Sequence, residues 1–176
     1  MDMRGQRQRE FQVHLEHVGN YRFESQASED GRAHGAPFLS DEPDPVGDSS
    51  APATPALLGA AVGHCLSASL LEALRRARVP VESLGTDVAC VVVPNAEGLP
   101  RIDHIEVVIR PALPATVARA RRCEEVFEKH CTVTSSVREG IDVSVRVDWQ
   151  VRSPGDGEAA GGMPSPQGAP SSAGTS

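Results

Sequence analysis

The sequence predicts an α+β fold, in which antiparallel β-sheets pack on a long central cysteine-bearing helix and a second helix. Two observations carry this prediction. Several short segments alternate between apolar and polar residues, as strands with one buried face do. Between them lies a stretch of about 24 residues, apolar and rich in small residues through its first four turns, which is too long for a strand and therefore predicts a helix.

The length and charge of the chain limit its organisation and its partners. Its 176 residues are enough for one domain. We expect a flexible N-terminus over residues 1–10, a single domain over 11–152 and a disordered tail rich in Gly, Pro and Ser over 153–176. The net charge of −7 disfavours nucleic acid or an anionic membrane as partner. No apolar run approaches the ~18–20 residues of a membrane span, and the charged N-terminus is unlike a secretory signal, so a cytoplasmic location is expected.

The N-terminal part predicts a β-hairpin followed by a loop. Phe11–Leu15 alternates as a half-buried strand does, and a Gly-Asn pair offers a turn into a second strand at Tyr21–Phe23. Ser25–Pro52 is rich in Asp, Glu, Ser, Gly and Pro and is expected to be loop-like. Within it, Ala36–Leu39 is interpreted as a short strand or an anchoring turn.

A long helix is predicted from Pro55 to about Arg78. Thr54 is its expected N-cap, with Pro55 at the first helical position, and Pro80 follows its end. Such a helix spans about 36 Å. Because only its last turn is openly charged, we expect it to be buried on most sides.

Two strands, a helix and a closing strand complete the expected order. Thr86–Pro94 and Ile102–Arg110 are rich in β-branched residues and should pair as an antiparallel hairpin. A second helix opens at Pro114, and Thr132–Ser136 is expected to break it. Ile141–Val151 alternates cleanly and is predicted to be the closing strand. Apolar residues recur at helical spacing in the second helix: Val117, Cys123, Val126, Phe127 and Cys131.

The four cysteines are Cys65, Cys90, Cys123 and Cys131, and no C-x-x-C pair occurs among them. In a reducing compartment they are expected to be thiols, so a reactive one would be a catalyst rather than a crosslink. From the residues alone, Cys65 and Cys131 are either inert core thiols or reactive ones, because reactivity needs a thiolate and a nearby cation. Cys90, in the middle of a strand, is interpreted as structural.

A zinc site from His64, Cys65, His130 and Cys131 is a further alternative. Adjacent side chains on a helix diverge, however, and the ligand spacing of structural zinc is absent. No metal and no cofactor are therefore predicted.

Two blocks around the cysteines resemble the OsmC/Ohr family. The first is PALLGAAVGHCLSA around Cys65, and the second is EKHCTVTSSV around Cys131. The expected order of elements also fits, and the resemblance extends from about Phe11 to Trp149. It implies an intertwined homodimer, with the long helices at its centre and the active site at the subunit interface.

The resemblance also implies thiol peroxidase chemistry in defence against oxidative stress. Cys65 would attack an organic hydroperoxide and become a sulfenic acid, Cys131 would condense with it to a disulfide, and an external dithiol would reopen that bond. Family members usually activate the thiolate with a Glu just after the Pro of the cysteine helix and an Arg from the N-terminal strands. Here Ala56 follows that Pro, and the candidate arginines are Arg22 and Arg32.

Two other functions are weighed against the peroxidase. A non-peroxidase member of the family would use the apolar dimer pocket to bind a small molecule, which the missing carboxylate favours. A purely structural domain would place the two cysteines far apart.

Overall fold

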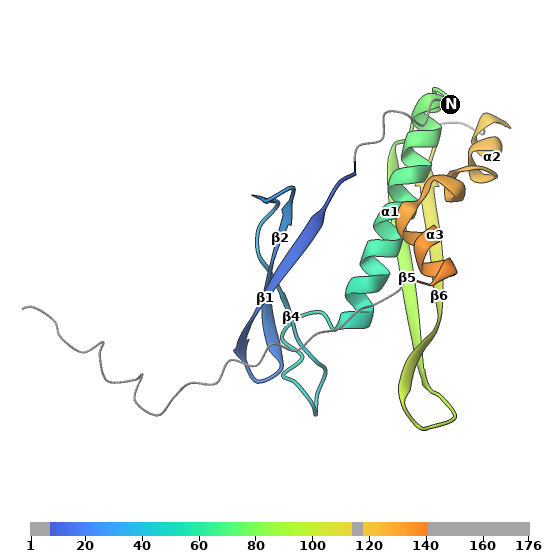
Figure 1. Ribbon diagram of the computed structural model, residues 1–176. Helices are drawn as coiled ribbons and strands as arrows, with labels where there is room; N and C mark the ends of the chain where they lie inside the picture. Colours follow the sequence, from blue (N-terminus) through green and yellow to red (C-terminus); the bar gives the residue numbers. More distant parts are fainter. Residues whose placement is uncertain (1–7, 114–117, 141–176) are drawn as a thin grey trace, which may run out of the picture. The chain divides into compact units, whose positions relative to one another are not determined.

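The computed structural model describes residues 8–113 and 118–140 and shows the predicted α+β fold with antiparallel sheets. One four-stranded sheet precedes the long helix, and a two-stranded hairpin and a helical layer follow it (Figure 1). The first sheet comprises β1 Phe11–Gly19, β2 Arg22–Glu29, β3 Arg32–Ala33 and β4 Phe38–Ser40. The remaining elements are α1 Thr54–Arg76, β5 Ser83–Pro94, β6 Pro100–Ala112, α2 Ala118–Glu124, the 3-10 helix η2 Phe127–His130 and α3 Thr132–Glu139.

The predicted N-terminal hairpin is confirmed. β1 pairs antiparallel with β2, with Val13 opposite Ala27, and Asn20 takes a positive φ of 43° in the turn. The expectation that the chain is loop-like from Ser25 onward is wrong, because β2 continues to Glu29. Pairing with β1 on one edge and with β3 and β4 on the other holds this polar segment in extended form. Cross-strand context of this kind overrides local propensity.

A tight loop ordered around one carboxylate connects β4 to α1. Asp41 is only 2% exposed. Its carboxylate accepts hydrogen bonds from the backbone N–H groups of Glu42, Asp48 and Ser50 and from the Ser50 hydroxyl, at 2.8–3.2 Å. These bonds, those from Ser50 foremost, hold the pKa of Asp41 below its usual value. The acidic segment is thus an ordered connection.

Helix α1 begins one residue earlier than predicted. Its N-cap is Ala53, whose carbonyl accepts the N–H groups of Ala56 and Leu57. The expectation that Thr54 is the N-cap is therefore wrong, because Thr54 already lies in the first turn beside Pro55. At the other end Arg78 takes a left-handed φ of 55°.

Burial on α1 is confined to one stripe. In the single chain, the expectation that the helix is buried on most sides is wrong: Leu71 is 41% exposed, and Ala60, His64 and Ala68 are exposed as well. By length and composition alone α1 could cross a membrane, but the core helix of a globular domain meets the same test, and α1 packs on β5, η2 and α3. The buried residues repeat at helical spacing: Gly59, Val62, Gly63, Leu66, Leu70 and Leu74.

Strands β5 and β6 form the predicted antiparallel hairpin and carry α1. Val88 lies opposite Val107, and both belong to the half-buried face of the hairpin. Two glycines let the helix approach this face closely. A Cβ added at Gly63 would stand 2.6 Å from a Val88 methyl, and one at Gly59 would stand 2.9 Å from the Cys90 sulfur.

The helical layer differs most from the prediction. The segment Thr132–Ser136, expected to break a helix, instead lies in α3. Cys131 has extended backbone angles and is the N-cap of α3, and the Ser135 N–H donates to its carbonyl at 3.1 Å. Thr and Ser disfavour helix interiors but are well tolerated in a first turn, which explains the outcome. Pro114, the closing strand 141–151 and the tail 153–176 lie outside the described residues.

Candidate thiol site

The structure brings Cys65 and Cys131 together from positions far apart in the sequence. Cys65 lies in the middle of α1, and Cys131 joins η2 to α3. All four cysteines of the chain are free thiols. Cys65 and Cys131 lie close enough to interact, since each thiol shifts the pKa of the other. Cys90 packs against Gly59, and Cys123 belongs to the buried core.

Cys131 is fully buried and surrounded by hydrogen-bonding groups. Its exposed fraction is 0%, and its thiol donates to the Thr134 hydroxyl at 3.0 Å. Burial raises the pKa of Cys131, but hydrogen bonds from Cys65, from the Thr134 hydroxyl and from the backbone of Thr134 and Val133 outweigh it. The pKa of Cys131 is therefore lowered. The N–H groups at a helix start have no partner within the helix, so they are available to a thiolate.

For Cys65 the effects that raise the pKa outweigh those that lower it. Burial raises its pKa, and its hydrogen bond to Cys131 raises it further. The backbone groups of Val133 and Thr134 act in the other direction but do not reverse the shift. Cys65 is only half-buried, so it is the member of the pair that an outside molecule can reach.

The two candidate arginines lie in the N-terminal sheet. Arg22 begins β2, and its guanidinium lies 3.8 Å from the position that a Cβ on Gly19 would take. Arg32 begins β3. Neither is among the groups that shift the pKa of Cys65.

Glu72 on α1 belongs to a different interaction. It forms ion pairs with Arg75 and Arg76, each at 2.8 Å. These two arginines lower the pKa of Glu72 to about 2. This carboxylate is therefore not a substitute for the Glu that the sequence lacks after Pro55.

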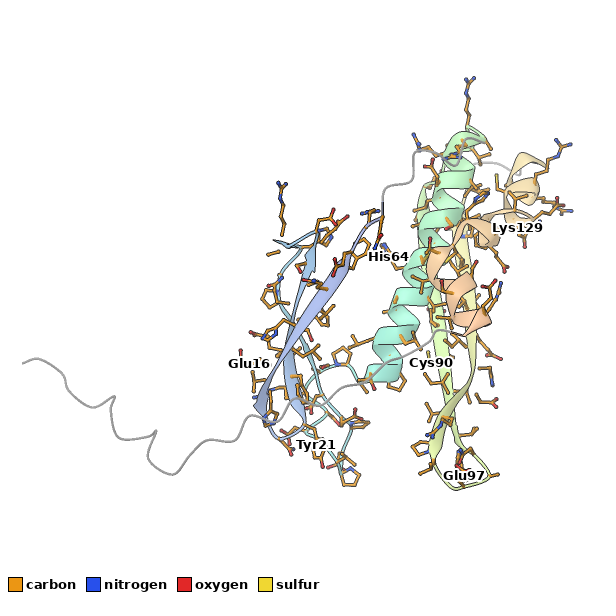
Figure 2. The ribbon with its side chains drawn as sticks, in the orientation of Figure 1. Glu16, Tyr21, His64, Cys90, Glu97 and Lys129 are labelled. Carbon is orange, nitrogen blue, oxygen red and sulfur yellow. The ribbon has the colours of Figure 1, made fainter. Side chains whose placement is uncertain are left out.

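The zinc alternative finds no support in the described residues. Both His64 and His130 are exposed, and Figure 2 shows His64 on the outer side of α1. Within residues 8–113 and 118–140, no group of three or more His, Cys, Asp or Glu side chains is positioned to hold a metal ion.

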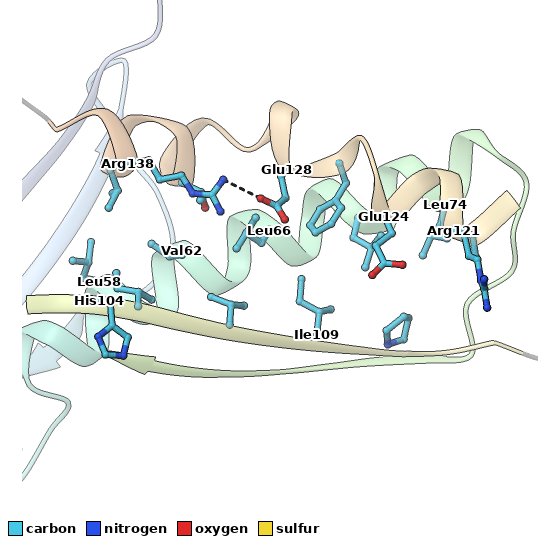
Figure 3. A pocket seen from close by; sticks show the side chains of 18 of the residues that line it. Leu58, Val62, Leu66, Leu74, His104, Ile109, Arg121, Glu124, Glu128 and Arg138 are labelled. Carbon is cyan, nitrogen blue, oxygen red and sulfur yellow. Dashed lines mark ion pairs between the residues drawn. The ribbon is translucent and has the colours of Figure 1, made fainter. Parts of the chain in front are cut away.

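A pocket of about 810 Å³, lined by an apolar floor and several charged side chains, lies on the same side of α1 as Thr134. α1, β6 and the helical layer line it, and Figure 3 shows Val62, Leu66 and Ile109 pointing into it. At its rim, Arg138 pairs with Glu128 at 2.9 Å.

Thr134 links this pocket to Cys131, because it lines the pocket and accepts the Cys131 hydrogen bond. The sequence-based interpretation missed Thr134, since it lies in the segment expected to break the helix. The available signal was a hydroxyl residue three positions after a cysteine that could cap a helix.

Comparisons with known proteins identify the family and the fold. A family model described as OsmC-like protein matches residues 47–146. An OsmC-like protein from Vibrio cholerae superimposes with a TM-score of 0.56 at 14% identity, covering 74% of this chain and 93% of that one. An OsmC-like protein from Mycoplasma pneumoniae gives 0.56 at 13% identity, with 75% and 88% covered. An organic hydroperoxide resistance protein from Legionella pneumophila gives 0.53 at 11%, with 73% and 89% covered. No curated protein matches.

Proposed function

The chain belongs to the OsmC-like protein family, and from that premise we propose that it reduces organic hydroperoxides through Cys65 and Cys131. One observation carries the proposal: two free thiols from distant parts of the chain meet at the start of α3. The Legionella relative, described as an organic hydroperoxide resistance protein, supports the same substrate class. We place this reaction in the cytoplasm, where thiols stay reduced.

In the proposed reaction the Cys65 sulfur reacts with the peroxide and the Cys131 sulfur then forms the disulfide. The half-buried Cys65 thiolate attacks the terminal oxygen of R–O–OH, the O–O bond breaks, and the alkoxide takes a proton to leave as the alcohol. Cys65 becomes a sulfenic acid. The Cys131 thiolate then attacks the Cys65 sulfur, the hydroxyl group leaves as water, and a disulfide forms. An external dithiol reduces that bond and completes the cycle.

This mechanism requires that the Cys65 thiol be converted to a thiolate. Its pKa is raised, so its proton has to pass to a base or a cation has to stabilise the thiolate. The Cys131 thiolate is the weaker base of the two, because the pKa of Cys131 is lowered while that of Cys65 is raised, so it does not take that proton. We further propose that Arg22 or Arg32 reaches Cys65 from a second copy of the chain in a homodimer. The loss of activity in Arg22→Ala or in Arg32→Ala would identify the arginine.

The homodimer is a proposal supported by exposed apolar surface. On one face of the N-terminal sheet, Phe11, Val13 and Leu15 are each more than half exposed. An apolar surface of this kind is typical of an interface. Light scattering coupled to size-exclusion chromatography should give twice the 18.6 kDa chain mass, whereas a mass of one chain would contradict the dimer.

The direct test of function is titration with cumene hydroperoxide. We expect stoichiometric loss of two thiols and a Cys65–Cys131 disulfide in peptide mass spectrometry. Cys65→Ser should abolish the reaction. The matched control Cys90→Ser should leave it unchanged, because Cys90 lies against Gly59 and apart from the pair. Unchanged thiols in the wild-type protein would contradict the peroxidase proposal.

Binding without peroxidase activity is the second candidate. The pocket with its apolar floor and the raised pKa of Cys65 favour it. In that case cumyl alcohol should raise the melting temperature of the protein, and the shift should keep growing with the logarithm of its concentration, while the thiols stay intact in the presence of the hydroperoxide.

A further inference from the structure

The two cysteines of the pair differ in exposure. Cys131 has no exposed surface, and its partner Thr134 is 6% exposed, whereas Cys65 is half-buried. A thiolate that reduces a disulfide attacks one sulfur and expels the other. An external reductant can therefore reach such a bond only at the Cys65 sulfur, and the departing sulfur has to be that of Cys131.

The surroundings of Cys131 suit a departing thiolate. The Thr134 oxygen lies 3.0 Å from the Cys131 sulfur. In the neutral thiol the sulfur donates this hydrogen bond, and once the sulfur is ionised the hydroxyl can turn and donate to it instead. The backbone of Val133 and Thr134 adds the N–H groups of the first turn of α3. A hydrogen bond to an ionised partner is stronger than one between neutral groups.

We propose that Thr134 is a positioning residue that stabilises Cys131 as the leaving group, so that the reductant forms its mixed disulfide with Cys65. This proposal deepens the proposed function and rests on it for its place in the catalytic cycle. The reductant thiolate R–S⁻ attacks the Cys65 sulfur, the Cys65–Cys131 bond breaks, and a Cys65–S–S–R bond forms. The electron pair of the broken bond stays on the Cys131 sulfur, which the Thr134 hydroxyl then holds.

The first experiment measures reduction independently of the peroxide reaction. The full-length protein is oxidised with diamide, and its reduction by dithiothreitol is followed between pH 6 and 9 by acid quenching and thiol labelling. Thr134→Val, which keeps the shape and loses the hydroxyl, should slow reduction by roughly threefold or more, since a rise of about one pKa unit in the leaving group acts on the rate through a fractional Brønsted coefficient. Thr134→Ser should stay within about twofold of the wild type, since it keeps the hydroxyl. Thr132→Val, an identical change at an exposed position of the same turn, should have no effect.

The second experiment uses the wild-type protein and does not depend on any variant folding. Oxidised protein is mixed briefly with glutathione, quenched in acid and digested, and the adduct is located by mass spectrometry. We expect glutathione on Cys65. Three outcomes would each overturn the inference. They are an adduct on Cys131, an equal reduction rate in Thr134→Val and the wild type, and failure of diamide to form the Cys65–Cys131 bond. If the thiols ignore cumene hydroperoxide yet diamide gives this bond and the adduct on Cys65, the peroxidase proposal alone fails.

Discussion

Because α1 approaches β5 closely at Gly63, we expect Gly63→Ala to lower the free energy of unfolding, whereas the same change in an exposed helix would raise it. In an exposed helix interior, Gly→Ala stabilises by about 1 kcal/mol, because alanine loses less backbone entropy. At Gly63 the new methyl would stand 2.6 Å from a Val88 methyl, well inside the ordinary contact distance. Overpacking of this kind costs roughly 1–3 kcal/mol. We therefore expect Gly63→Ala to destabilise the fold by about 1 kcal/mol.

A double-mutant cycle isolates the clash. Val88→Ala alone removes two half-buried methyl groups and should cost about 1 kcal/mol. In that background the methyl of Gly63→Ala fills the vacated space, so the substitution should become stabilising by about 1 kcal/mol. The expected coupling energy between the two sites is thus about 2 kcal/mol, within the range for residues in contact.

The assay is urea unfolding followed by circular dichroism, at fixed protein concentration and with a reductant present so that no disulfide contributes. Ala60→Gly, at an exposed position of the same helix, is the control for helix propensity and should cost about 1 kcal/mol. If Gly63→Ala stabilises the wild-type protein, or has the same effect in both backgrounds, the argument from close packing is refuted.

Three further predictions concern individual side chains. Asp41→Asn should lower the melting temperature by several degrees, because an NH2 group then replaces one of the two oxygens that accept hydrogen bonds from Glu42, Asp48 and Ser50; no change in a thermal melt would contradict this. Glu72→Gln should destabilise slightly at pH 7. Because the folded pKa of Glu72, about 2, lies below the ordinary 4.5, its contribution is full above pH 4.5 and is lost as the pH falls towards 2; melts of the two proteins should converge there and in high salt. Phe127→Ala, at a side chain 8% exposed, should cost about 3 kcal/mol, whereas Val126→Ala beside it, 44% exposed, should stay within about 0.5 kcal/mol.

Local sequence patterns predicted those elements whose residues carry their own signal. Alternation and a Gly-Asn turn located β1 and the start of β2, and runs of β-branched residues located β5 and β6. A long apolar stretch located α1 to within two residues at each end. The second half of β2 could not be found in this way, because Ser25–Glu29 is polar and its extended form depends on strands on both sides.

The site was predictable in its cysteines and not in its surroundings. Cys65 and Cys131 stand in sequence blocks that resemble those of a known family, and the structure brings them together. The sequence did not predict a role for Thr134, because runs of Thr and Ser usually indicate the end of a helix. Only the extended backbone of Cys131 makes this run a beginning. Whether a segment of this composition ends one helix or starts another depends on a backbone conformation that residue preferences do not determine.

Because the fold brings Cys65 and Cys131 together, the reduction potential of the pair depends on the folding of the chain. Their disulfide would close a loop of roughly 66 residues, which restricts the unfolded chain and favours the fold by about 4 kcal/mol. A thermodynamic cycle has to close, so folding favours the disulfide over the dithiol by the same amount, which for two electrons is about 90 mV. The folded pair is therefore the weaker oxidant, and a substitution that moves Cys65 and Cys131 apart in the folded protein should make the bond easier to reduce. The packing of α1 on α3, which holds the two cysteines together, thereby contributes to how strong a reductant the cycle requires.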